Sequence, residues 1–103
     1  MSFNQSRTWK WKSWDISWSL SEKSTGENDL NILLVHGFGA SKKHWRHNQD
    51  FLGKVTNCYA IDLLGFGESS QPSALLDYEP YKENSIKYSF DLWANQILSL
   101  IHI

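Results

Sequence analysis

Two apolar segments that each run into a glycine-containing loop constrain the fold of this chain more than any other feature. The segments are 31–36 and 57–61, and the loops that follow them are 37–41 and 62–72. The first segment does not alternate with polar residues, which is typical of a strand covered on both faces in a parallel sheet. Between the two strands, 42–54 shows rough helical spacing of apolar residues after a capping serine. A strand, a helix and a second strand in this order predict an α/β fold with a largely parallel sheet flanked by helices.

The segments on either side of this unit extend the pattern. Large apolar and small polar residues alternate over 14–20, which predicts a half-buried strand, and a shorter strand is expected around 9–11. The polar stretch 73–87 is expected to be irregular, and Ser89 is expected to cap a last helix. The apolar face of that helix is predicted to carry Phe90, Trp93, Ile97 and Ile101.

The charge balance argues against one large class of partner. Ten Lys and Arg residues stand against eleven Asp and Glu residues, a formal net charge of -1, whereas nucleic-acid-binding domains usually carry a basic excess. No nucleic-acid partner is therefore expected. The longest apolar run, 32–35, is far too short to span a membrane, and the N-terminus lacks the apolar core of a signal peptide. We expect no transmembrane segment and a cytoplasmic location.

Metal and cofactor sites also lack their usual motifs. The single cysteine, Cys58, excludes an intramolecular disulfide and a cysteine-based zinc site. His44 and His47 lie three residues apart but have no third ligand near them in the sequence. The pair of glycines in 65–67 begins a dinucleotide-binding motif, yet Ser70 stands where its third glycine belongs. We expect neither a bound metal nor a cofactor.

The two glycine loops together resemble a known family. One strand ends in His36-Gly37, and after a helix the next strand ends in D-x-x-G-x-G-x-S over 62–69. In this order and at this distance, the two motifs resemble the N-terminal part of the α/β-hydrolase fold, over about 9–103 with 1–8 as a tail. Within that superfamily the chain is similar to plastid and cyanobacterial members, the group that contains chlorophyll dephytylase. The matching residues are Trp9, Trp11, 36–41, 44–46, Asn48, 59–67, Ser69, Pro72, 88–90, Trp93 and Gln96.

The resemblance implies a mostly parallel sheet and hydrolysis of a carboxylic ester through an acyl-enzyme formed on a serine. It implies a small-molecule ester as substrate, with long-chain esters such as phytyl esters as candidates, and a plastid or cyanobacterial source. In the family, the backbone N–H of the residue after His-Gly forms half of the oxyanion hole, and here that residue is Phe38. The nucleophile lies in a G-x-S-x-G elbow, which these 103 residues do not contain. The fold is therefore expected to be truncated before the elbow, with no triad residue and no activity alone.

Two alternative functions stay open. With an aspartate nucleophile, the parent protein would be an epoxide hydrolase or a dehalogenase. This alternative stays open because the elbow that distinguishes these enzymes from esterases is absent from these 103 residues. The other alternative is a non-catalytic remnant, or an interaction fragment that keeps only the N-terminal scaffold.

The polar and glycine residues of the two loops are expected to shape the backbone rather than to react. The family's catalytic base follows its nucleophile in sequence, so the His36 ring is expected to hydrogen-bond nearby backbone instead. Asp62 is expected to orient its loop, and the basic run 42–47 is expected to be a solvated face. The expected loop-shaping residues are His36, Gly37, Gly39, Asp62, Gly65 and Gly67.

Overall fold

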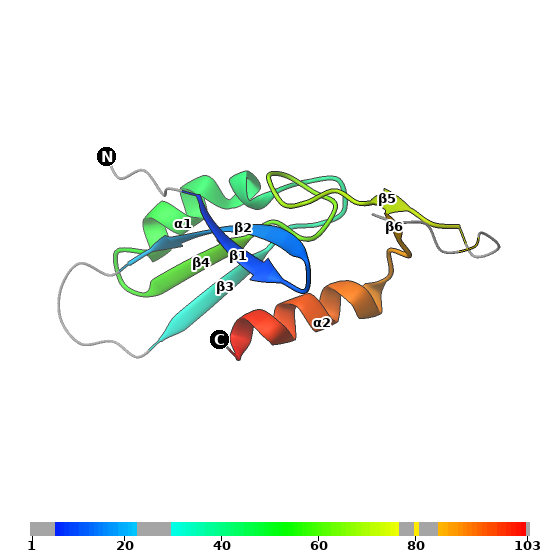
Figure 1. Cartoon of the computed structure of the whole chain (residues 1–103). Helices are drawn as coiled ribbons and strands as arrows, with labels where there is room; N and C mark the ends of the chain where they lie inside the picture. Colours follow the sequence, from blue (N-terminus) through cyan, green and yellow to red (C-terminus); the bar gives the residue numbers. More distant parts are fainter. Residues whose placement is uncertain (1–5, 23–29, 77–79, 81–84, 103) are drawn as a thin grey trace.

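The computed structural model describes residues 6–22, 30–76, 80 and 85–102. The elements in chain order are β1 (Arg7–Trp11), β2 (Trp14–Ser21), β3 (Asn31–Val35), the 3₁₀ helix η1 (Lys42–Trp45), α1 (Arg46–Leu52), β4 (Asn57–Ile61), β5 (Ser73–Ala74), β6 (Ser85–Ile86) and α2 (Phe90–Ile101). The first four strands form one sheet in the order β1-β2-β4-β3, and β5 pairs with β6. Figure 1 shows α1 on one face of the four-stranded sheet and α2 on the other, as an α/β fold requires.

Strand direction departs in part from the expected largely parallel sheet. β3 and β4 run parallel, with Val35 opposite Ile61, because the connection between them crosses over through α1. The pairs β1–β2 and β2–β4 are antiparallel. β1 and β2 form a hairpin whose turn places Lys12 at a φ of 57°. The described sheet is therefore mixed, because this hairpin adds antiparallel strands beside the parallel pair.

The helix expected over 42–54 is shorter and begins differently. Ser41 caps it as expected and accepts the N–H of Lys43 at 3.3 Å, but the first turn is the 3₁₀ helix η1, and α1 ends at Leu52. Both the hydroxyl and the N–H of Thr56 donate to the Leu52 carbonyl, each at 2.9 Å. These bonds satisfy a carbonyl at the end of the helix, and the chain then turns toward β4.

The expectation of a half-buried β2 is wrong in one respect, because its small polar face is also covered. Ser17, Ser19 and Ser21 are all buried, with Ser69 of the loop after β4 bonded to Ser17 and Gln49 of α1 bonded to Ser19. The Ser19 hydroxyl donates to Oε1 of Gln49 at 3.1 Å, and Nε2 of the same amide donates to the Cys58 carbonyl at 2.9 Å. Serine is small enough to let the helix approach closely, and its hydroxyl is satisfied by a helix side chain. The alternation of polarity in β2 thus separates an apolar face, which carries the buried Ile16, from a serine face that is buried through hydrogen bonds.

The face of α2 that packs on the sheet agrees with the predicted one only in part, because Trp93 packs there but Phe90 and Ile101 do not. Phe90 and Ile101 are 87% and 61% exposed. Among the described residues, Trp11, Ile16, Ile61 and Leu64 form a buried apolar cluster, and the α2 residues packed against it are Leu92, Trp93 and Leu100. Gln96 lies fully buried on the same side of α2. The apolar pattern missed part of this face because the central residue on it is polar and is buried by its hydrogen bonds.

Candidate functional site

The parallel pair β3–β4 brings the two glycine loops together at one edge of the sheet (Figure 1). Carboxyl ends of adjacent parallel strands meet at the same edge, and this edge is where α/β proteins usually bind ligands. His36 follows β3 directly, and Asp62 follows β4 directly. We call residues 36–41 the first turn and residues 62–70 the second loop.

His36 joins these two segments through its ring. Only 3% of the residue is exposed. Its Nε2 accepts the N–H of Leu63 at 3.0 Å, and its Nδ1 lies 2.7 Å from the carbonyl of Gly37. Nδ1 therefore carries the proton and donates to that carbonyl. Both ring nitrogens are occupied by backbone groups, so neither is positioned to take a proton from a nucleophile.

Asp62 forms the centre of the polar network under the site. The residue is fully buried, and its carboxylate accepts the backbone N–H of Lys42 at 2.6 Å, the Lys42 ammonium at 3.0 Å and the N–H of Glu68 at 2.9 Å. Its backbone carbonyl accepts the hydroxyl of Ser69 at 2.7 Å. That hydroxyl in turn accepts the N–H of Ser17 from β2, at 2.9 Å. One aspartate thus connects the first turn, the second loop and the sheet.

Lys42 contradicts the expectation that the whole basic run 42–47 is solvated. Its side chain is 4% exposed and lies 3.0 Å from the Asp62 carboxylate and 2.7 Å from that of Glu68. A buried ammonium loses its hydration, and two carboxylate partners offset that cost. The hydrogen bond from Lys42 also lowers the pKa of Glu68. Sequence pattern could not separate Lys42 from Lys43, which is exposed as expected.

Glycine is required by the backbone in the second loop. Gly65 and Gly67 have φ values of 91° and 55°, and Gly39 in the first turn has a φ of 80°. A Cβ on Gly67 would lie 2.4 Å from Cγ of Asp62, within the packed carboxylate. Gly37 differs, since its φ is outside the left-handed region and a Cβ there would meet no described atom within 4 Å.

Two side chains of α2 hold the second loop from below. Oε1 of Gln96 accepts the N–H of Leu64 at 2.9 Å, and Nε1 of Trp93 donates to the Leu64 carbonyl at 2.9 Å. The N–H and the carbonyl of the buried Leu64 are therefore both hydrogen-bonded to side chains of α2. Sequence reasoning assigned Gln96 no role. The available signal was its position three residues after Trp93, which places both on one helix face.

Phe38 lies at the tip of the first turn, and its side chain is 87% exposed. Within the described part of the chain, its backbone N–H has no hydrogen-bond partner. Its ring meets Phe66 edge-on with centroids 5.3 Å apart and Trp93 at 6.4 Å. Tyr88 and Phe90 also pack on Trp93, with centroids 5.9 and 6.2 Å away. We call these five side chains the aromatic rim.

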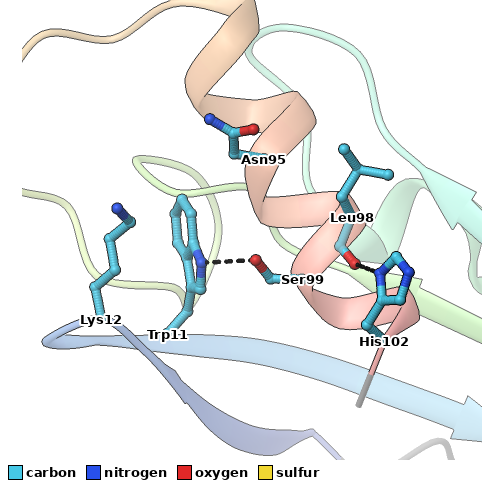
Figure 2. A pocket seen from close by; sticks show the side chains of 6 residues that line it. All are labelled: Trp11, Lys12, Asn95, Leu98, Ser99 and His102. Atoms are coloured by element: carbon cyan, nitrogen blue, oxygen red, sulfur yellow. Dashed lines mark hydrogen bonds between the residues drawn. The ribbon is translucent and has the colours of Figure 1, made fainter.

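Two hollows lie away from this edge. Figure 2 shows the first, of about 420 Å³, where the Trp11 indole donates to the Ser99 hydroxyl at 3.2 Å beside Lys12 and His102. The second, of about 910 Å³, is lined by β1, Trp18 of β2, β3, Tyr59 of β4 and the end of α2. Neither includes a residue of the first turn or the second loop.

Further findings concern metal ligands and membrane spans. His44 and His47 lie on the exposed side of η1 and α1. Over residues 6–22, 30–76, 80 and 85–102, no three His, Cys, Asp or Glu side chains gather as a metal site would require. In the same ranges, no helix has the length and apolar character needed to cross a membrane.

Comparison with known proteins agrees with this geometry. Residues 31–101 match the family described as alpha/beta hydrolase fold. This chain belongs to the alpha/beta hydrolase fold family. The hydrolase-fold chain is 37% identical over 76 residues to 1-acylglycerol-3-phosphate O-acyltransferase ABHD5 of Sus scrofa, and the aligned segment covers 74% of this chain and 22% of that protein. It is 30% identical over 76 residues to (lyso)-N-acylphosphatidylethanolamine lipase of Mus musculus, again covering 74% of the chain and 22% of the lipase.

A solved structure extends the match to nearly the whole chain. The thioesterase domain from the curacin biosynthetic pathway superposes on 98% of it with a TM-score of 0.75 at 18% identity, and 33% of that domain is covered. This likeness shows the fold alone. The chain spans about a fifth of the length of the curated relatives it matches, so it presents a partial alpha/beta hydrolase fold.

Proposed function

We propose that this chain supplies the oxyanion-stabilising turn and part of the acyl-binding surface of a lipid esterase that acts through a serine nucleophile. The observation that carries the proposal is the Phe38 N–H, which has no partner in the described part of the chain and lies at the carboxyl edge of the parallel pair. A backbone donor held in place before reaction stabilises the negative oxygen of a tetrahedral intermediate. The held position comes from His36, whose ring bonds to the second loop.

The aromatic rim supports an apolar acyl group as the substrate part nearest this turn. Phe38 and Phe90 each expose 87% of their surface, and such exposure is unusual for large apolar side chains unless something binds there. The relatives named above are enzymes of acyl lipids and not specifically chlorophyll dephytylases. A long-chain acyl ester is therefore the proposed substrate class, and a phytyl ester is a narrower candidate within it.

The loop residues have supporting roles in this proposal. His36, Asp62 and the glycines at 37, 39, 65 and 67 shape the backbone around the donor, and none of them reacts. The serine nucleophile is proposed from the lipase relative, since no G-x-S-x-G motif occurs in these 103 residues. Epoxide opening and dehalogenation have only fold-level support, which does not carry a function.

A chimera tests the proposal. Residues 31–101 of this chain would replace the homologous segment of the mouse lipase, and hydrolysis of a long-chain acyl ester would be measured. Phe38→Pro removes the N–H, and loss of one oxyanion donor costs on the order of a hundredfold in kcat. Phe38→Ala keeps the N–H and removes only the ring, so it is the matched control.

The two variants separate the donor from the acyl surface. Phe38→Ala is expected to raise KM for long-chain esters more than for short-chain esters, with little change in kcat. Circular dichroism of each variant reports whether the fold is intact. Equal kcat values for Phe38→Pro and Phe38→Ala, in folded proteins, would remove the oxyanion assignment. An inactive but folded chimera would favour the non-catalytic alternative.

A further inference from the structure

Lys42 is an unusual residue to find buried, and the described geometry gives it three simultaneous connections. Its ammonium reaches both Asp62, at 3.0 Å, and Glu68, at 2.7 Å. Its backbone N–H donates to the other oxygen of the Asp62 carboxylate at 2.6 Å. A charged hydrogen bond is stronger and more directional than a neutral one, so these contacts restrain both partners. Lys42 thus holds the start of η1 against the second loop.

This connection lies between the two segments that form the candidate site. Lys42 follows the first turn directly, four residues after Phe38. Asp62 and Glu68 bracket most of the second loop, and the Glu68 N–H donates to the same carboxylate oxygen that receives the ammonium. Gly67 packs so closely on that carboxylate that no Cβ fits between them. Movement of the Lys42 ammonium would therefore weaken the restraint on both the first turn and the second loop, and only the backbone donors of Lys42 and Glu68 would still hold the carboxylate.

We infer that Lys42 is a positioning residue that sets the direction of the Phe38 N–H through its bridge to the buried Asp62 and the half-exposed Glu68. The inference rests on the proposed function, in which that N–H stabilises the oxyanion. Lys42 itself lies under the site and touches no substrate. Its contribution is to hold the donor where negative charge develops, and displacement of such a group by about 1 Å can cost about a hundredfold in rate.

The first test uses the whole 103-residue chain and needs no activity. Lys42→Met removes the charge and keeps much of the side-chain length, and Lys43→Met is the matched control because Lys43 is the exposed neighbour. Amide signals in ¹H–¹⁵N spectra are the readout. We expect Lys42→Met to displace the Phe38 and Gly39 signals and to leave Ile16 in β2 unchanged. Lys43→Met should leave all three in place. Undisplaced Phe38 and Gly39 signals in Lys42→Met would overturn the inference.

A second variant covers the case in which Lys42→Met disturbs the whole sheet. Removing Lys42 alone leaves a buried carboxylate unpaired, which is strongly unfavourable, whereas Lys42→Met/Asp62→Asn removes both charges. We expect the double variant to recover the Ile16 signal while Phe38 and Gly39 stay displaced. Recovery of all three signals together would show that Lys42 acts only on general stability, and the inference would fail.

The second test uses the hydrolase chimera described above and separates the two proposals. Lys42→Met/Asp62→Asn is expected to lower kcat about 10- to 100-fold with little change in KM, because an oxyanion donor acts in the transition state. A normal kcat in this variant together with a reduced kcat in Phe38→Pro would overturn the role of Lys42 and leave the proposed function standing. A normal kcat in Phe38→Pro would instead overturn the proposed function.

Discussion

A methyl group added at Gly67 provides the sharpest test of the network around Asp62. Gly67 has a φ of 55°, and a Cβ there would lie 2.4 Å from Cγ and 2.5 Å from Oδ2 of Asp62. A left-handed backbone costs an alanine about 1–2 kcal/mol relative to glycine. The carboxylate must also move, and each hydrogen bond to a charged group contributes about 1.5–3 kcal/mol. We therefore expect Gly67→Ala to lower the free energy of unfolding by about 3–5 kcal/mol.

Gly37→Ala is the matched control in the same site. A Cβ at Gly37 meets no described atom within 4 Å, and the backbone there is outside the left-handed region. Glycine-to-alanine changes at such positions are neutral or stabilise by about 0.4–1 kcal/mol, since the unfolded chain loses freedom.

Urea unfolding followed by fluorescence of the six tryptophans measures both variants. Equal midpoints for Gly67→Ala and Gly37→Ala would refute the reasoning, as would a loss below about 1 kcal/mol at Gly67. Such a result would mean that the Asp62 carboxylate has room to shift without losing its three donors.

Four further outcomes are expected. Gln96→Leu should lower the free energy of unfolding by about 1–3 kcal/mol, because a buried N–H loses its acceptor, while the exposed Asn95→Ala should change it by less than about 0.5 kcal/mol. The 103-residue chain alone should hydrolyse p-nitrophenyl esters no faster than a boiled sample; turnover blocked by a serine-reactive inhibitor would contradict this. Burial raises the pKa of the Cys58 thiol. Labelling of Cys58 by a thiol reagent should therefore be on the order of a hundredfold slower in the native chain than in urea. Equal labelling rates would show that the core around Cys58 is open. The Lys42 hydrogen bond lowers the pKa of Glu68 below its ordinary 4.5. The ionised Glu68 therefore stabilises the folded chain above pH 4.5, and this contribution is lost as the pH falls through the lowered pKa. Glu68→Gln should therefore reduce the loss of stability on acidification, measured as urea midpoints between about pH 3 and 6.

Local sequence determined the elements and the position of the candidate site. The apolar runs form strands over 31–35 and 57–61, and Ser41 and Ser89 each cap the following helix with their hydroxyls. These features depend on neighbours within a few residues, so spacing and capping preferences are enough to locate them. The order of strand, helix and strand then requires a crossover and a parallel pair, which places both glycine loops at one sheet edge.

Tertiary structure alone decided which polar groups are buried. Lys42 resembles Lys43 in sequence, yet only Lys42 meets carboxylates that lie 20 and 26 residues further along the chain. Gln49 and Gln96 are buried for the same reason, since each amide satisfies backbone of another element, 9 residues away for Gln49 and 32 residues away for Gln96. The free energy of burying a polar group depends on its partners rather than on its own polarity. A pattern of apolar spacing carries no information about such partners, so the network that holds the Phe38 turn emerged only when the loops were brought together.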